Sequence, residues 1–408
     1  MIIIRWALGL GGLAAAIVMA VTALPSRAED VSASNIVEHY QKLLDQGAAK
    51  LSYAEGKHGY LPDLLRAFRI PRESQLLVFS ASSLQFDKIN QKTPRALYYQ
   101  DDISIGAVQG GNLIEIVVTD KNSGVAFYTL DAAKSDKPRF VRRTTECVTC
   151  HGFASGWAPG LMVASYATGP GGQLLNLDPY NLFHLTDDRT PFEDRYGGWY
   201  VTGQTGSMRH RGNVTIVPED PITVPPGGTN LTDLEDRIDK EDYLEPGSDI
   251  VSLLTLEHQA GFVNLVTRIN AQYLSLDPKI PMPRRATRAD IDASIDELVS
   301  YMTFEKEVPL PSAVTGTTGF AKTFSQQGVR DSKGRSLRQF DLGTRVFRYP
   351  LSYMIHSQAF DILNSAAKDR VLRRLYDSLS GRPAGAAAIN IVAATKTGLP
   401  DSWKPVPE

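Results

Sequence analysis

The sequence predicts an α+β fold, with an antiparallel sheet in the N-terminal half and a mainly helical C-terminal half. Residues 76–142 contain short runs rich in β-branched and aromatic side chains, and turn residues separate these runs. After residue 247, apolar residues recur at helical spacing. The chain of 408 residues is 42% hydrophobic and 22% charged, as expected for a globular protein rather than a disordered one.

Two helices are expected before the sheet. Residues 34–54 place Ile36, Tyr40 and Leu44 on one face, and Ser34 is a suitable N-cap. A second, short helix is predicted for 62–68.

Five strand segments follow. They are joined by turn residues such as Gly110-Gly111 and the run 121–124, which favour antiparallel connections. The predicted segments are LLVFS (76–80), ALYYQ (96–100), DISIGAVQG (102–110), LIEIVVTD (113–120) and GVAFYTLD (124–131).

The second half of the chain begins with loops and ends with helices. Residues 165–230 are rich in Gly, Pro and aromatic residues, and long loops in compact domains are often functional. Helices are predicted near 248–275, 288–303 and 364–379, the last ending before Gly381 and Pro383.

The N-terminus is typical of an export signal. Arg5 is the one charge before a long apolar run, and Ser26 and Ala28 are small residues at the −3 and −1 positions of a cleavage site. The alternative is an uncleaved anchor, because the run approaches the length that spans a bilayer. We therefore expect a periplasmic protein, with membrane contact if the segment is retained.

We divide the chain into four regions. These are a signal peptide (1–28), a helix plus β-rich region (29–145), a loop-rich region that starts at the cysteines (146–246), and a mainly helical region (247–408). Residues 29–408 are expected to form one integrated body.

Charge and cysteine content exclude several classes of function. The formal net charge is −2, so nucleic acid is not an expected partner. With two cysteines, the chain cannot form a disulfide-rich scaffold or a four-cysteine metal site.

Both cysteines lie in one pentapeptide, Cys147-Val148-Thr149-Cys150-His151. This C-x-x-C-H pattern is the attachment motif for c-type haem. On a helical turn the two thiols share one side, where each can form a thioether with one haem vinyl group, and the histidine can bind iron. One motif predicts one covalent haem c, at the junction of the sheet and the helical half.

Three other interpretations of the motif are weaker, and one of them is a chance occurrence of the pattern. A redox-active dithiol is expected near a thioredoxin-like βαβ unit, which the sequence does not show. A zinc site needs further ligands, and the adjacent Cys150 and His151 are poorly placed to share one tetrahedral ion.

The chain also resembles a family of large bacterial exported c-type cytochromes with a single haem. The resemblance is carried by PRFVRRTTECVTCHG (138–152), TPFEDRYGGWYVTG (190–203) and LEHQAGFVNLVTRIN (256–270), together with KTPRALYYQDD (92–102), AFYTLD (126–131), RHRGN (209–213) and RDSKGRSLRQFDL (330–342). It implies haem binding and electron transfer, and it implies no particular substrate.

The second axial ligand of the iron is the main open choice. His258 is the first candidate, because it lies in an apolar stripe of a predicted helix. His210 in a basic loop and Met162, close to the motif, are the next candidates, followed by Met282 and His184. Each could instead be an ordinary packing or surface residue.

The two haem propionates would require compensation by cationic or amide groups. Arg142 and Arg143 directly precede the motif, and Arg268 lies on the same predicted helix as His258. We therefore predict these three arginines as propionate-binding residues, although each could equally belong to a solvated face.

Two functions from different classes follow from these residues. The first is an electron carrier that exchanges electrons with a redox partner protein. The second is a haem-c oxidoreductase, peroxidase-like or acting on a small molecule, with an open or labile distal site. A haem sensor is a third interpretation, and no transmitter segment supports it.

Overall fold

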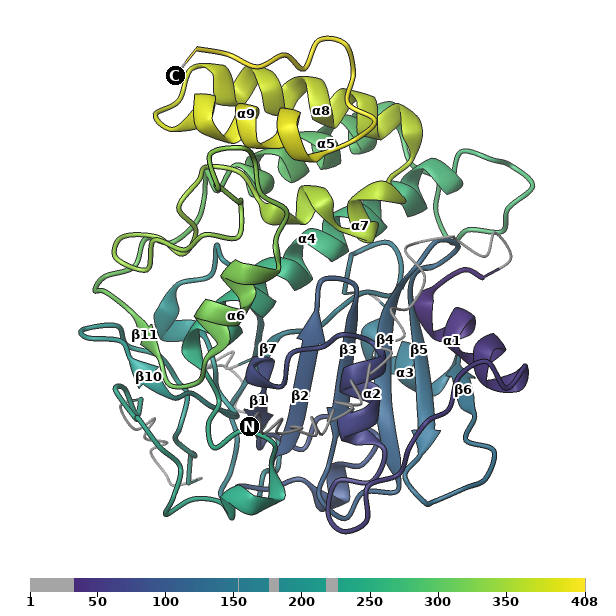
Figure 1. Cartoon of the computed structure of the whole chain (residues 1–408), viewed down its shortest axis with the longest axis vertical. Helices are drawn as coiled ribbons and strands as arrows, with labels where there is room; N and C mark the ends of the chain where they lie inside the picture. The colour runs from purple at the N-terminus through teal and green to yellow at the C-terminus, as the bar shows by residue number, and fades with distance from the viewer. Residues whose placement is uncertain (1–32, 153, 176–182, 218–226, 408) are drawn as a thin grey trace, which may run out of the picture. The chain divides into compact units, whose positions relative to one another are not determined.

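A seven-stranded antiparallel sheet forms the centre of the computed structural model (Figure 1). Its strand order is β6-β5-β4-β3-β2-β1-β9. This arrangement confirms the α+β class and the five predicted strand segments, and it adds β6 and β9. The strands are β1 (Leu76–Val78), β2 (Arg95–Gln100), β3 (Ile103–Ala107), β4 (Leu113–Asp120), β5 (Gly124–Asp131), β6 (Phe140–Arg143) and β9 (Trp199–Tyr200).

The structure describes residues 33–152, 154–175, 183–217 and 227–407. The predicted signal peptide, 1–28, lies outside these residues. From Ser34 onward the chain forms one compact unit. No helix in the described ranges is long and apolar enough to cross a membrane.

Strand register divides the sheet into two faces. Tyr99 is opposite Ser104, Ser104 is opposite Val117, and Val117 is opposite Phe127, so these four side chains share one face. We call it the cavity face. The alternate residues form the opposite face and a separate apolar core, which includes Leu77, Tyr98, Ile105, Ile116 and Tyr128.

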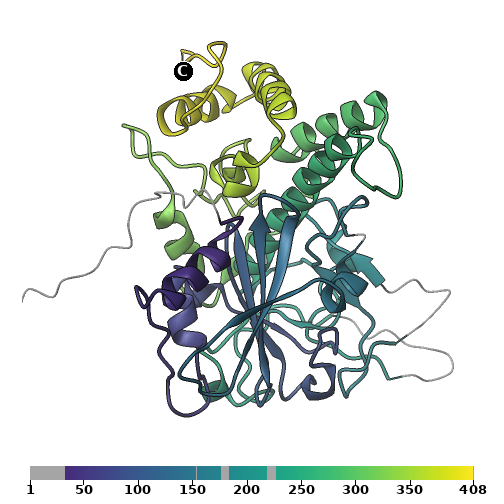
Figure 2. The same cartoon turned by 90° about the vertical axis from the view of Figure 1, so that its right-hand side faces the viewer.

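Helices α1 (Ile36–Asp45) and α2 (Leu61–Ala67) cover the opposite face, as the two purple helices in Figure 2 show. The predicted helix over 34–54 is too long. It ends at Asp45, with Gln46 as the C-cap residue, because Gly47 follows with a φ of 71°. The N-cap is Asn35 rather than Ser34, and its side chain accepts hydrogen bonds from the amides of Val37 and Glu38.

The long helix α4 (Ile250–Leu274) packs on the cavity face. The Tyr99 hydroxyl of β2 donates a hydrogen bond of 2.6 Å to the carbonyl of Ser252. The sequence predicts a single apolar stripe on this helix, but its polar side is buried too, including Glu257 and His258. The reason is that α5, α7 and the sheet all pack against α4, so almost no side faces solvent.

The C-terminal helices pack beyond α4, at the top of Figure 1. The predicted helices at 288–303 and 364–379 are observed as α5 (Arg288–Met302) and α8 (Ser365–Ser380). Three helices were not predicted from sequence: α6 (Phe320–Gln327), α7 (Gln358–Asp361) and α9 (Gly385–Thr395).

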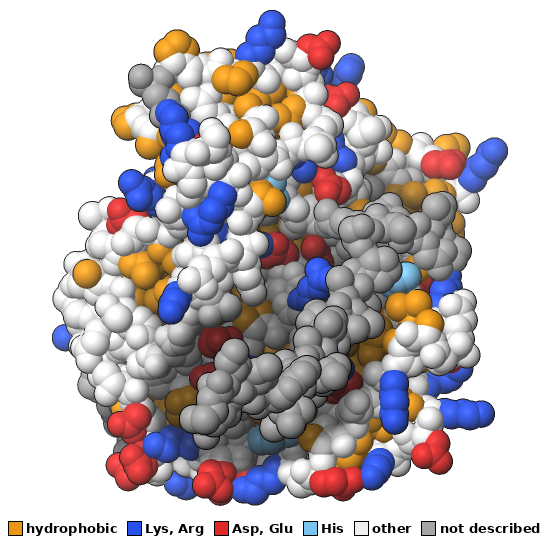
Figure 3. Space-filling model, in the orientation of Figure 1, with side chains coloured by type: hydrophobic (Ala, Val, Ile, Leu, Met, Phe, Trp, Pro, Cys, Tyr) orange, Lys and Arg blue, Asp and Glu red, His pale blue; other side chains and the backbone are white. Residues whose placement is uncertain are grey.

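The remaining elements are short. The 3₁₀ segments are Arg72–Ser74, Phe86–Lys88, Phe192–Asp194, Lys240–Asp242 and Tyr353–His356. Two small ladders pair β7 (Ala164–Tyr166) with β8 (Phe183–Leu185), and β10 (Gly203–Gln204) with β11 (Thr315–Gly316). Basic and acidic side chains are interspersed on the face drawn in Figure 3, which fits the small net charge.

Candidate haem-attachment site

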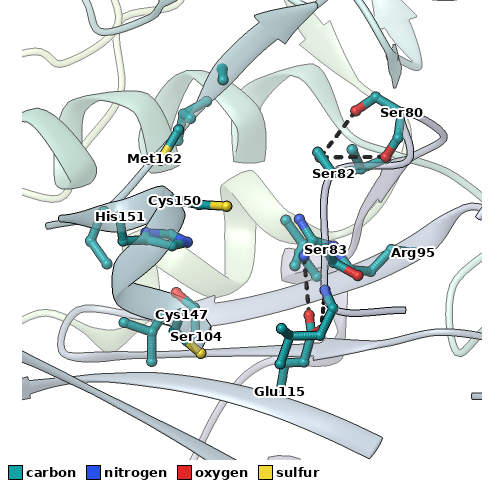
Figure 4. Close-up of a pocket in the computed structure, with 18 of the residues that line it drawn as sticks. Ser80, Ser82, Ser83, Arg95, Ser104, Glu115, Cys147, Cys150, His151 and Met162 are labelled. Atoms are coloured by element: carbon teal, nitrogen blue, oxygen red, sulfur yellow. Dashed lines mark hydrogen bonds and ion pairs between the residues drawn. The ribbon is translucent and has the colours of Figure 1, made fainter. Parts of the chain in front are cut away.

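The CxxCH motif lies on the short helix α3 (Glu146–His151), which begins shortly after the edge strand β6 ends at Arg143. Cys147 and Cys150 are free thiols, the first partly buried and the second exposed. Both cysteines and His151 line the same cavity. Figure 4 shows their side chains projecting from α3 toward Arg95, Ser83 and Glu115.

The cavity has a volume of about 380 Å³, within the usual range for small-molecule and cofactor sites. Its floor is the cavity face of the sheet, where Ser104 and Gly106 are small and leave space between larger neighbours. The lining is mostly apolar. It includes Val78, Leu97, Tyr99, Val117 and Phe127 from the sheet, Leu161 and Val163 after α3, and Leu256 and Ala260 from α4.

His151 is held in the form that binds a metal. Its Nδ1 lies 2.8 Å from the carbonyl oxygen of Gly160, which can only accept a hydrogen bond, so the ring proton is on Nδ1. The Nε2 atom therefore keeps a lone pair. Burial lowers the pKa of His151, which favours the neutral ring. The ring also packs against Phe127, with centroids 4.8 Å apart, and this contact limits its rotation.

The environment of Cys147 does not favour redox chemistry. Burial, together with the nearby carboxylates of Glu115 and Glu146, raises the pKa of Cys147 to about 11. Redox-active CxxC motifs have the opposite property, a lowered cysteine pKa that maintains a reactive thiolate. The zinc interpretation needs three or four side-chain ligands, and the described residues contain no such group of His, Cys, Asp and Glu.

The structure separates the candidate second axial ligands. Met162 lines the cavity, whereas His258, His210, Met282 and His184 are not among its described lining residues. His258, the first candidate from sequence, has both ring nitrogens in hydrogen bonds. Its Nδ1 lies 2.7 Å from Oδ2 of Asp188, and its Nε2 lies 2.7 Å from Oγ of Ser352. This face of α4 packs against other segments rather than the cavity.

Asp188, His258 and Ser352 are hydrogen-bonded in sequence, as in the catalytic triad of a hydrolase. Unlike such a triad, they are not accessible to a substrate. The three side chains are buried, and the space beside Asp188 and His258 is about 10 Å³. That volume holds at most one water molecule, so a substrate cannot reach the serine. We interpret the three residues as a structural network.

His210 is also buried. Its Nδ1 accepts a hydrogen bond of 3.1 Å from the amide of Gly212, and its ring contacts Tyr196. Burial lowers the pKa of His210 to about 4. The basic loop predicted from sequence is therefore packed into the body at this residue.

The three arginines predicted to bind propionates do not line the cavity. Arg142 pairs with Glu38 of α1, and Arg143 donates to Thr129 and Glu146. Arg268 donates to the carbonyl of Ser155 and to Glu297. Arg142 is opposite Tyr128, on the face away from the cavity. Arg143 is opposite Phe127, on the cavity face, but its guanidinium is held by Thr129 and Glu146.

Arg95, at the start of β2, is the cation that sequence reasoning missed. Among the described residues that line the cavity, it is the one Lys or Arg. Its Nη1 donates to Oε2 of Glu115 at 3.1 Å, while its buried Nε has no hydrogen-bond partner in the described chain. Because side chains alternate along β2, Arg95 lies on the same face as Leu97 and Tyr99. This alternation can be recognised in the sequence.

Comparisons with known protein families, with curated proteins and with solved structures find no match for this chain. The interpretation of the site therefore rests on its residues and their geometry.

The position of His258 leads to a first prediction. His258→Ala should lower the free energy of unfolding by about 2–4 kcal/mol, because it removes the partner of the Asp188 carboxylate and one partner of the Ser352 hydroxyl, and it opens a cavity. The absorption spectrum of the haem-loaded protein should not change. Denaturant unfolding and absorption spectra measure the two effects, with His39→Ala on the partly exposed side of α1 as the control. A changed spectrum in the folded variant would restore His258 as an iron ligand.

Proposed function

We propose that the chain is an exported c-type cytochrome that carries one covalent haem and transfers electrons. One observation supports this most directly: the free Nε2 of His151 and the thiols of Cys147 and Cys150 line one cavity. A neutral imidazole with its Nδ1 proton held by a carbonyl is a common metal ligand. Export is part of the proposal, because c-type haem is attached outside the cytoplasm.

The cysteines would attach the haem by thiol addition. Each Sγ forms a bond to one vinyl carbon, and the thiol proton goes to the neighbouring carbon, so no oxidant is needed. Bound iron would supply a one-electron couple between ferric and ferrous states. The raised pKa of Cys147 keeps its proton on the thiol at neutral pH until the addition occurs.

The rest of the cavity suits a large, flat, mainly apolar group with a polar edge. Its apolar lining would exclude water from the ring and so influence the redox potential. The hydroxyls of Ser80, Ser82 and Ser83 line one end and could bind carboxylates. The lining residues Leu84, Phe86 and Leu174 are exposed by 39%, 63% and 42%, and they form an apolar rim where a redox partner could approach the haem edge.

A second candidate is a haem-c oxidoreductase. It is favoured by the lining of the cavity. Among the described lining residues, Met162 is the one His or Met besides His151, so few side chains could occupy a second axial position. An iron with a single firm protein ligand can bind small molecules, as haem enzymes do.

The decisive experiment for both candidates is maturation of the full chain in a host that attaches c-type haem. We expect one haem per chain that survives denaturing electrophoresis, and a sharp c-type α-band after reduction with dithionite. A folded protein without covalent haem under these conditions would remove both candidates.

The cavity floor provides a test of fit. Gly106→Leu should reduce haem incorporation severalfold, because the new side chain would extend from β3 into the space above Leu97 and Glu115. Haem content per folded chain, measured by absorbance, reports the effect. Gly381→Leu is the control, since a side chain there meets nothing within 4 Å. Equal haem content in both variants would show that the haem does not occupy this cavity.

A further inference from the structure

The side of the cavity across from His151 carries polar residues. Figure 4 shows Ser83, Arg95 and Glu115 on that side, with Cys147, Cys150 and His151 facing them from α3. His151 packs against Phe127 of β5, and Arg95 begins β2. In the strand order β5-β4-β3-β2, these residues are three strands apart. At about 4.8 Å per strand, the two backbones are roughly 14 Å apart. The side chains of Arg95 and Glu115 extend from the sheet toward His151, and both charges act on its ring, so the polar groups face His151 across the cavity.

Met162 lies on the same side of the cavity as His151, so it would not reach an iron from the face opposite His151. It follows Gly160 by two residues, and the Gly160 carbonyl accepts from Nδ1, the ring nitrogen that would not bind iron. Asn264 of α4 holds the intervening residue by hydrogen bonds to the Leu161 amide and carbonyl, at 2.8 and 2.9 Å. In Figure 4, Met162 lies beside Cys150 and His151, not across from them.

Arg95 has a buried N–H donor without a partner among the described residues. Glu115 binds its Nη1, and the other carboxylate oxygen of Glu115 accepts from the amide of Leu84 at 3.2 Å. The guanidinium is thus anchored to two elements of the fold. Its Nε remains buried and without a partner among the described residues. A buried N–H donor costs free energy unless a ligand or water accepts its hydrogen bond.

We propose that the iron face opposite His151 is a binding site for a small anion, and that Arg95 holds the anion through its Nε–H. The ligand class is small anions that can coordinate iron with one atom and accept a hydrogen bond with another, such as cyanide, azide or nitrite. This inference rests on the proposed haem attachment. It favours a ligand-binding cytochrome over a simple carrier.

The test is a cyanide titration of the ferric, haem-loaded full chain, followed by absorption. Wild type should bind cyanide, and Arg95→Gln should bind it about tenfold or more weakly, the effect of losing one charged hydrogen bond. Arg139→Gln is the matched control: it changes the charge equally at an exposed site and should bind as wild type does. Arg95→Lys can keep the pair with Glu115 but has no N–H at the position of Nε, so its affinity should fall as well.

Three results would overturn the inference while leaving the haem assignment intact. The first is a wild-type protein with a c-type α-band that binds neither cyanide when ferric nor carbon monoxide when ferrous. The second is a Met162→Leu variant that gains ligand binding, which would make Met162 the second axial ligand. The third is unchanged cyanide affinity in Arg95→Gln with a shifted midpoint potential, which would make Arg95 a propionate partner. Absence of the α-band itself would instead refute the proposed function.

Discussion

Replacing both Cys147 and Cys150 with alanine is expected to abolish covalent haem attachment completely. The two thiols are the one pair in the chain, and both line the cavity beside His151. Without them, no thioether can form, and haem would be held by His151 and apolar contacts alone. Haem staining after denaturing electrophoresis and intact mass spectrometry measure the loss directly.

The control for this experiment lies on the same helix. The Thr149 hydroxyl donates to the Thr145 carbonyl and does not line the described cavity, so Thr149→Ala should retain full haem content. His151→Ala should retain covalent attachment with an altered spectrum, because the thioethers would remain while the axial ligand is lost. Covalent haem in the double cysteine variant would contradict the assignment.

Removing Glu257 is expected to cause the largest loss of stability. Glu257 accepts hydrogen bonds of 2.9 Å from both Arg195 and Tyr196, and the Arg195 side chain is 2% exposed. Glu257→Ala would leave the guanidinium buried without its counter-charge. Breaking a buried pair in this way costs about 3–5 kcal/mol, so the free energy of unfolding in urea should fall by that amount.

A surface pair provides the comparison. Glu305 pairs with Arg382, and both side chains are partly exposed, so solvent screens their attraction. Glu305→Ala should change stability by less than about 1 kcal/mol. If the Glu257 and Glu305 variants lost equal stability, the buried pair would have no special role in holding α4 against the Arg195 segment.

Local sequence patterns were reliable where neighbours in the chain determine the conformation. The strands between 76 and 131 alternate in a way that suits a sheet covered on both faces, and α4, α5 and α8 match their predicted ranges closely. The helix at 34–54 was too long, because the effect of Gly47 at its end was not recognised. The helix is therefore shorter than predicted, but the same apolar face of α1 packs against the sheet.

The site was predictable in part. Cys147, Cys150 and His151 are recognised together because their chemistry depends on fixed spacing along one helical turn. Arg95 was missed because it meets Glu115 and the cavity through pairing of β2, β3 and β4, over twenty residues of sequence. His258 was favoured because an apolar stripe does not reveal which neighbour each side of a helix meets.

The sequence by itself determined the α+β class, the main strands and helices, and the motif that predicts the haem. These depend on interactions within a few residues, where spacing and residue type suffice. The tertiary structure alone decided which side chains share the cavity, placing Arg95 there and burying His258 with Asp188 and Ser352. The physical reason is that strand register and helix packing are cooperative results of the whole core, in which a shift of one residue turns a side chain to the other face.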